Sequence, residues 1–227
     1  MKHLERDLER LQRDVLKLAT SVEEIIHRSI EALRTRDVAL AEEIIASDAE
    51  IDERENQVSE ECFQALAIHQ PVAGDLRRIA SILAITTDLE RMADLAVEIA
   101  ERAESLAKQP PIFIPNKLRQ MTDLTTTMVR QSLDAFVNQD VHLAKQVCRM
   151  DDEVDRLNKG IIEEIVALMK QSTDHIEPGL SLFSAVRHLE RIADHATNIA
   201  EDVVYLVEGR IIRHHPEEIN STEMGAP

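Results

Sequence analysis

Apolar residues recur every three or four positions over long stretches of this 227-residue chain. That spacing places them along one face of a helix, and the strict alternation typical of strands is absent from the sequence. Between residues 4 and 33 the apolar face is formed by Leu4, Leu8, Leu11, Val15, Leu18, Val22, Ile25 and Leu33. A second such run follows between residues 143 and 168. The pattern predicts an all-α protein built from long amphipathic helices.

Glycine and proline, which interrupt helices, are rare and fall in a few places. The five Gly and seven Pro lie mainly at 71–74, 110–115, 178–179 and after residue 208, with Gly160 as the main exception. Two further breaks contain neither residue, but there Asp37 and Asp140 precede a new apolar run and can cap a helix by accepting backbone N–H bonds. Together these breaks predict six helices, at about 5–35, 38–69, 75–108, 116–138, 141–172 and 178–208.

The two halves of the chain are related. LERMADLAVEIAE at 89–101 and LERIADHATNIAE at 189–201 share nine of thirteen residues at an offset of 100, and residues 36–52 align with 139–155 at an offset of 103. The repeated unit therefore contains three helices. We expect two tandem three-helix bundles of long antiparallel helices, stacked either end to end or side by side. The bounds of these parts are 1–108 for the first bundle, 109–115 for a Pro-rich linker, 116–209 for the second bundle and 210–227 for a polar tail.

Within the repeat, an acidic residue is followed four positions later by aspartate. Residues four apart lie on the same helix face, where two like charges repel by a few tenths of a kcal/mol unless a cation binds between them. In so acidic a chain about eight such pairs are expected by chance as parts of solvated helix faces, so a single pair is no evidence for a metal site. Four pairs at corresponding positions of two diverged repeats favour metal binding instead: Asp48 and Asp52, Glu90 and Asp94, Asp151 and Asp155, Glu190 and Asp194.

The acidic stripe continues along the third and sixth predicted helices. Glu98 and Glu101 extend it in the third, and Asn198 and Glu201 extend it in the sixth. If the second predicted helix lies against the third, its two aspartates face this stripe and complete a set of oxygen ligands. Such sites suit Mg, Ca, Mn or ferric iron and tolerate Zn. Because Asn198 replaces Glu98, we expect two similar sites of unequal affinity.

Histidine and cysteine are less informative. His188 and His195 lie beside the second stripe, where each could be a metal ligand or, as we expect more strongly, a partly buried, hydrogen-bonded side chain. Cys62 and Cys148 have no cysteine counterpart in the other repeat, which favours roles as small apolar residues.

Charge and composition exclude several classes of function. The chain has 43 acidic and 26 basic residues, a net charge of -17, four Phe, one Tyr and no Trp. It therefore lacks the basic surface and stacking platforms of nucleic-acid-binding proteins, and it is repelled by anionic membranes. No apolar stretch is long enough to span a membrane, and the charged first residues do not resemble a secretory signal. Two cysteines are too few for a disulfide framework. We expect a cytoplasmic protein with reduced thiols and no direct membrane insertion.

Motifs for catalysis are missing from the sequence. It contains no phosphate-binding P-loop, no G-x-S-x-G and no H-E-x-x-H. A ferritin-like di-iron centre needs two E-x-x-H elements, and the chain offers one, Glu24 with His27. We therefore expect no enzyme. The alternative is a metal-dependent helical-bundle hydrolase that uses the carboxylate stripes.

Two segments carry a family resemblance that spans essentially the whole chain. HLERIADHATNIAEDVVYLVEGRIIRH at 188–214 and its echo DLERMADLAVEIAE at 88–101 resemble the PhoU family of phosphate-specific transport system accessory proteins. The family motif often reads E-R-I-G-D, whereas this chain has Ala93 and Ala193 in place of the glycine. The departure adds only a methyl group and leaves the carboxylates unchanged.

The resemblance implies more than the periodicity does. Proteins of that family are cytoplasmic, usually dimeric, and consist of two three-helix bundles. They are negative regulators of the phosphate-starvation response and modulators of phosphate uptake, linking the phosphate ABC transporter, through its ATPase subunit PstB, to the sensor histidine kinase PhoR. They bind metals through E/D-x-x-x-D motifs, with iron the first expectation and Zn, Mg, Ca or Mn as others. In this chain the motifs fall on the four acidic pairs named above.

Overall fold

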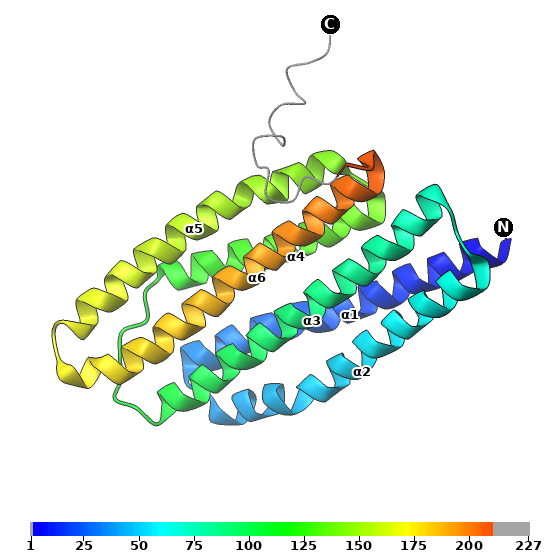
Figure 1. Cartoon of the computed structure of the whole chain (residues 1–227). Coiled ribbons are helices and arrows are strands. Elements are labelled where there is room, and N and C mark those ends of the chain that lie inside the picture. Colours follow the sequence, from blue (N-terminus) through cyan, green and yellow to red (C-terminus); the bar gives the residue numbers. More distant parts are fainter. Residues whose placement is uncertain (1, 211–227) are drawn as a thin grey trace, which may run out of the picture.

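The computed structural model describes residues 2–210, and these residues form six long helices with no strand among them (Figure 1). The helices are α1 (Lys2–Thr35), α2 (Val38–His69), α3 (Ala73–Ala107), α4 (Lys117–Asn138), α5 (Val141–Met169) and α6 (Ile176–Glu208). A short 3-10 helix, η1 (Thr173–His175), precedes α6. The predicted all-α fold with six helices is confirmed, and most of the predicted tail lies outside the described residues.

Two aspartates start helices as the sequence predicts. The side chain of Asp37 accepts a hydrogen bond from the backbone N–H of Leu40 at 3.1 Å, and α2 begins at the next residue. Asp140 accepts hydrogen bonds from the backbone N–H groups of His142 and Leu143 at 2.9 and 3.0 Å, and α5 begins at the residue after Asp140. Each cap satisfies backbone donors that have no partner within the helix.

The connection between α5 and α6 differs from the prediction. Helix α5 ends at Met169 instead of residue 172, because the hydroxyl of Ser172 accepts from the N–H of Asp174 and starts η1. Helix α6 begins at Ile176, before Pro178. Proline is tolerated there because N–H groups in the first turn of a helix have no intrahelical acceptor.

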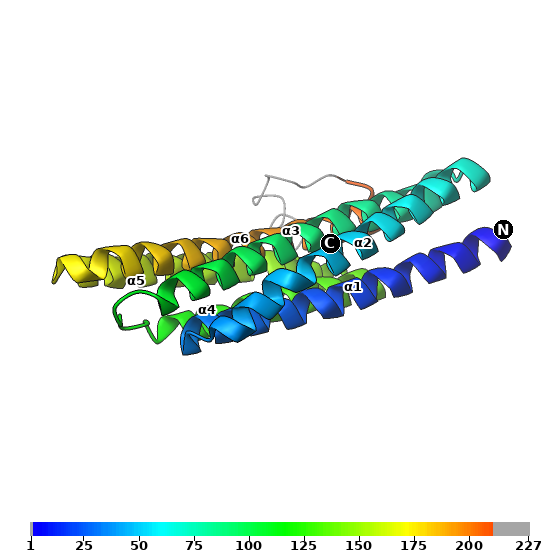
Figure 2. The same ribbon diagram turned by 90° about the horizontal axis from the view of Figure 1, so that it is seen from below.

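The helices are arranged in two layers. Helices α2, α3, α6 and α5 lie side by side in that order and form one layer, and α1 and α4 lie next to each other across it (Figures 1 and 2). Each repeat is a three-helix bundle, and the two bundles pack side by side through the antiparallel pair α3 and α6 and through α1 and α4. The structure thus decides between the two arrangements that the sequence left open.

The core is made mainly of Leu, Ile, Val and Ala, and Phe136 is the one buried aromatic residue among those described. The central helices α3 and α6 contribute more buried residues than the other helices, because each is long and packs against its own bundle and against the other repeat. Ala93 and Ala193 are both buried, so a side chain larger than alanine at these positions would push neighbouring helices apart.

The segment between α3 and α4 is fastened to both repeats. Arg36, at the α1–α2 turn, donates to the carbonyl oxygen of Pro110 at 3.0 Å. Ser181 of α6 donates to the side-chain oxygen of Gln109 at 3.3 Å, and Ile112 and Ile114 pack on the core.

Within residues 2–210, no helix is both long enough and apolar enough to cross a membrane.

Candidate metal centres

The first carboxylate cluster forms where α2 meets α3. One carboxylate oxygen each of Asp48, Asp52 and Asp94 lies within 4.8 Å of the other two. Two oxygens on opposite sides of a calcium-sized ion are about 5 Å apart, so these three atoms can bind one ion. Oδ1 of Asp48 is buried without a hydrogen-bond partner among the described residues. The donor set and this unsatisfied atom fit a hard cation.

Electrostatics in the first cluster favour a cation as well. Burial raises the pKa of Asp48, Glu90 and Asp94, and repulsion from neighbouring carboxylates raises each pKa further. For Asp94 these neighbours are Asp52 and Glu98. The ionised cluster is therefore under strain that a positive charge would relieve.

The second cluster forms at the equivalent place, where α5 meets α6. Burial raises the pKa of Asp151 to about 6, and the negative charges of Asp194 and Asp155 contribute to this shift. Burial also raises the pKa of Glu190 and of Asp194. The Glu190 side chain is only 12% exposed and pairs with Arg187 at 2.7 Å. The four acidic pairs predicted from the sequence thus form two clusters, one in each repeat. Among the described residues, three carboxylate oxygens lie within 4.8 Å of one another only in the first cluster.

Two of the predicted stripe residues reach across to the other repeat. Oε2 of Glu98 lies 2.9 Å from Nδ1 of His188 as an ion-pair contact without the alignment of a hydrogen bond. Asn198 donates to Oδ1 of Asp88 at 3.3 Å. At the offset of 100 between the repeats, Asn198 corresponds to Glu98 and Asp88 corresponds to His188, so the second contact is the counterpart of the first. Glu98 still lies close enough to the first cluster to raise the pKa of Asp94, whereas the Asn198 amide nitrogen is engaged at the repeat interface.

The last two predicted residues interact with groups other than the clustered carboxylates. Glu101 is 3.1 Å from the guanidinium of Arg102. The pKa of Cys148 is raised to about 12, chiefly by burial, and the charge of Glu201 is the next contribution. Glu201 is therefore near the Cys148 thiol, and Cys148 itself lies about one helical turn before Asp151 on α5.

His195 has the hydrogen-bonded environment that we expected. Its Nδ1 lies 2.7 Å from Oδ1 of Asp88, and the two side chains are 14% and 11% exposed. Sequence reasoning did not find Asp88, because the partners are 107 positions apart and belong to different repeats.

Two further residues of the clusters were also missed. The charge of Glu55 on α2 raises the pKa of Glu90, and Asn158 on α5 donates to Oε1 of Glu190 at 3.5 Å. Glu55 and Asn158 align at the same offset of 103 as the aspartates of these helices. The alignment of the two repeats could have revealed both residues. They were overlooked because each follows the preceding aspartate by three positions, whereas the pattern that we followed has a spacing of four.

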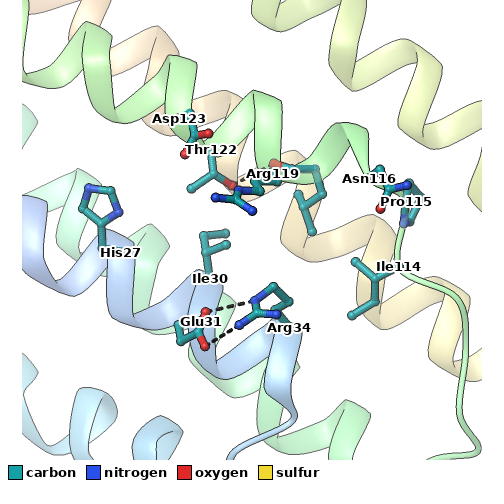
Figure 3. A pocket seen from close by; sticks show the side chains of 11 residues that line it. His27, Ile30, Glu31, Arg34, Ile114, Pro115, Asn116, Arg119, Thr122 and Asp123 are labelled. Carbon is teal, nitrogen blue, oxygen red and sulfur yellow. Dashed lines mark hydrogen bonds and ion pairs between the residues drawn. The ribbon is translucent and has the colours of Figure 1, made fainter.

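A groove between α1 and α4 lies apart from both clusters (Figure 3). Its volume is about 520 Å³, and its walls carry both signs of charge. Glu31 and Arg34, joined by hydrogen bonds of 2.6 and 3.0 Å, lie on α1, and Arg119 and Asp123 lie on α4. His27 also lines this groove. No predicted carboxylate ligand lines the groove, so we do not assign it a role in metal binding.

The fold and the clusters define a class of protein: an all-α tandem repeat with a carboxylate cluster on the helices of each repeat. A family model described as the PhoU domain matches residues 15–103 and again residues 118–203, one match in each repeat. The chain belongs to the PhoU family.

Relatives and solved structures agree with this assignment. The chain is 41% identical to a phosphate-specific transport system accessory protein PhoU homolog of Aquifex aeolicus, over 92% of this chain and 95% of the relative. A homolog of the same description from Pseudomonas putida is 38% identical, with 92% and 82% covered. The crystal structure of PhoU from Pseudomonas aeruginosa superposes with a TM-score of 0.86 at 37% identity, covering 91% of this chain and 99% of that one. For the phosphate transport system regulatory protein PhoU of Streptococcus pneumoniae the TM-score is 0.86 at 31% identity, covering 92% and 98%.

Proposed function

We propose that this protein is a cytoplasmic negative regulator of the phosphate-starvation response and a modulator of phosphate uptake. The observation that carries the proposal is the PhoU domain match in both repeats, together with relatives named as accessory proteins of phosphate transport. A role in regulating phosphate transport follows from these names at the level of the family. We propose that the protein acts by binding partners, as an accessory protein of a transport system does.

The proposed mode of action is that of an adaptor. The protein, as a homodimer, would connect the ATPase subunit PstB of the phosphate ABC transporter with the sensor histidine kinase PhoR. A net charge of -17 suits this role, because an acidic helical surface is attracted to basic docking surfaces and repelled by membranes and nucleic acids.

Metal binding at the two clusters is part of the proposal. The convergent oxygens of Asp48, Asp52 and Asp94, and the raised pKa values in both clusters, support it. Iron is the first candidate, and Zn, Mg, Ca or Mn are the others. When bound, the cation neutralises the repelling carboxylates. The aspartates of α2 and α3, and those of α5 and α6, would then hold their helices together through shared coordination.

A reporter strain tests the proposal. Deleting the gene should derepress a phosphate-regulated promoter at high phosphate, because a negative regulator has been removed. Complementation with the wild-type chain should restore repression, and so should a control with Glu53→Ala and Glu163→Ala, which changes exposed acids outside the clusters. Repression that persists in the deletion strain overturns the proposal.

The same material tests the hydrolase alternative. The purified protein is assayed for phosphoester hydrolysis with each candidate metal. Metal-dependent turnover that disappears with Asp94→Ala and Asp194→Ala, together with a reporter that stays repressed in the deletion strain, would establish an enzyme in place of a regulator.

A further inference from the structure

Asn158 of α5 is buried against the second cluster with an unsatisfied oxygen. Its residue is 5% exposed, and its Oδ1 has no hydrogen-bond partner among the described residues. Its amide nitrogen contacts Oε1 of Glu190 at 3.5 Å, and Oε2 of Glu190 is also buried without a partner. Each buried acceptor oxygen without a partner is costly in a folded protein, and a cation bound by the neighbouring Asn158 and Glu190 side chains would satisfy both.

The first cluster has a carboxylate at the equivalent position. Glu55 accepts a hydrogen bond from Ser59 at 2.8 Å, and its charge raises the pKa of Glu90. Glu98 and Asn198 differ in the same way. At six aligned positions the first repeat thus has six carboxylates, and the second has four carboxylates and two amides: Asp48/Asp151, Asp52/Asp155, Glu55/Asn158, Glu90/Glu190, Asp94/Asp194 and Glu98/Asn198.

We infer that the two clusters select cations of different charge, and that Asn158 is a neutral oxygen ligand that sets the preference of the second cluster. The inference rests on the proposed metal function and adds to it. The second cluster takes a single divalent ion. The first takes more positive charge, as a trivalent ion or as more than one divalent ion.

The physical reason is the number of anionic ligands. The attraction between an ion and its ligands grows with the product of their charges, so each added carboxylate favours a trivalent ion over a divalent one. A carboxamide oxygen still coordinates a hard cation but contributes no net charge. The second cluster has Asn158 where the first has Glu55, and its preference therefore shifts from trivalent toward divalent ions.

Single-cluster variants of the full chain separate the two sites. Asp194→Ala leaves the first cluster, and Asp94→Ala leaves the second. Each is titrated with Mn²⁺ by calorimetry and with Tb³⁺ by luminescence. We expect the ratio of Tb³⁺ to Mn²⁺ affinity to be at least about tenfold greater for the first cluster.

Reciprocal exchanges then test Asn158 itself. Asn158→Glu in the Asp94→Ala background should raise that ratio by about tenfold, and Glu55→Asn in the Asp194→Ala background should lower it by about the same factor. Asn158→Gln is the matched control, because it keeps a neutral amide and should leave the ratio unchanged. If Asn158→Glu does not fold, the half-buried Glu55 position still gives the answer.

The outcomes distinguish the two proposals. If neither single-cluster variant binds either ion, the metal function fails, and this inference fails with it. If both variants bind with equal ratios and the Glu55→Asn exchange has no effect, the metal function stands and the charge selection is wrong. Mn²⁺ binding undiminished by Asn158→Ala in the Asp94→Ala background would exclude Asn158 as a ligand.

Discussion

Oδ1 of Asp88 in α3 accepts a hydrogen bond from Nδ1 of His195 in α6 at 2.7 Å, so that a buried polar pair joins the two repeats. Asn198 donates to the same oxygen. The pair has no counterpart on the other side of the interface, because Leu95 occupies the position equivalent to His195. The interface between the repeats is therefore asymmetric although the repeats themselves are similar.

Removing the shared acceptor of this interface should destabilise the protein. Asp88→Ala leaves the donors of His195 and Asn198 without their partner, and we expect the free energy of unfolding to fall by about 1–3 kcal/mol. Urea denaturation measures the change. Thr87→Ala, at the exposed neighbouring position, is the control. A variant Asp88→Ala as stable as this control would show that the pair contributes nothing.

Stability should depend on pH through Asp151. Its pKa is about 6 in the folded protein and near 3.8 when unfolded, so between these values the folded state binds more protons than the unfolded state. In the absence of metal, the free energy of unfolding therefore falls as pH rises from about 4 to 6. After allowance for partial solvent screening the loss is about 1–2 kcal/mol. Asp151→Asn should flatten this dependence in urea titrations, whereas Asp152→Asn, at the exposed neighbour, should not.

Cation binding should stabilise the folded state. At a concentration of one hundred times Kd, one site adds about 2.7 kcal/mol to the free energy of unfolding. For a chain of this size we expect an increase in Tm of about 5–10 °C. Differential scanning calorimetry with and without a chelator checks this. The gain should vanish with Asp94→Ala and Asp194→Ala and persist with Glu53→Ala and Glu163→Ala.

The two thiols should react slowly in the native protein. Burial raises the pKa of Cys62 and of Cys148 to about 12. At pH 8 only about one thiol in ten thousand is then ionised, and the thiolate is the reactive form. Mass spectrometry after iodoacetamide treatment should find little modification until urea is added. Rapid alkylation of either cysteine without urea would contradict the burial of its thiol.

A single repeat should not remain a monomer. Helix α3 packs against α6 as well as against its own bundle, so a fragment of residues 1–108 would expose this second contact face. We expect the fragment to self-associate through α3, which light scattering after gel filtration would detect. A monodisperse, monomeric fragment would show that the bundles are independent.

Much of the fold could be predicted from the sequence, because helix period, aspartate caps and rare breakers are local signals. The four acidic pairs were also visible, since a spacing of four defines one helix face. The side-by-side arrangement was not predictable, because either stacking lets each repeat bury its apolar face. The Asp88–His195 contact depends on that arrangement and was missed for the same reason. Asn158 was missed because its role depends on burial, which its residue type does not reveal.

The segment of nine residues between α3 and α4 has a consequence for assembly. Two separate three-helix chains would meet only by diffusion, and their pairing would weaken on dilution. A short tether instead keeps the partners together at an effective concentration of the order of millimolar. The association of the two repeats therefore does not depend on the concentration of the protein in the cell. A gene duplication that joined two three-helix units by this tether would have removed that dependence.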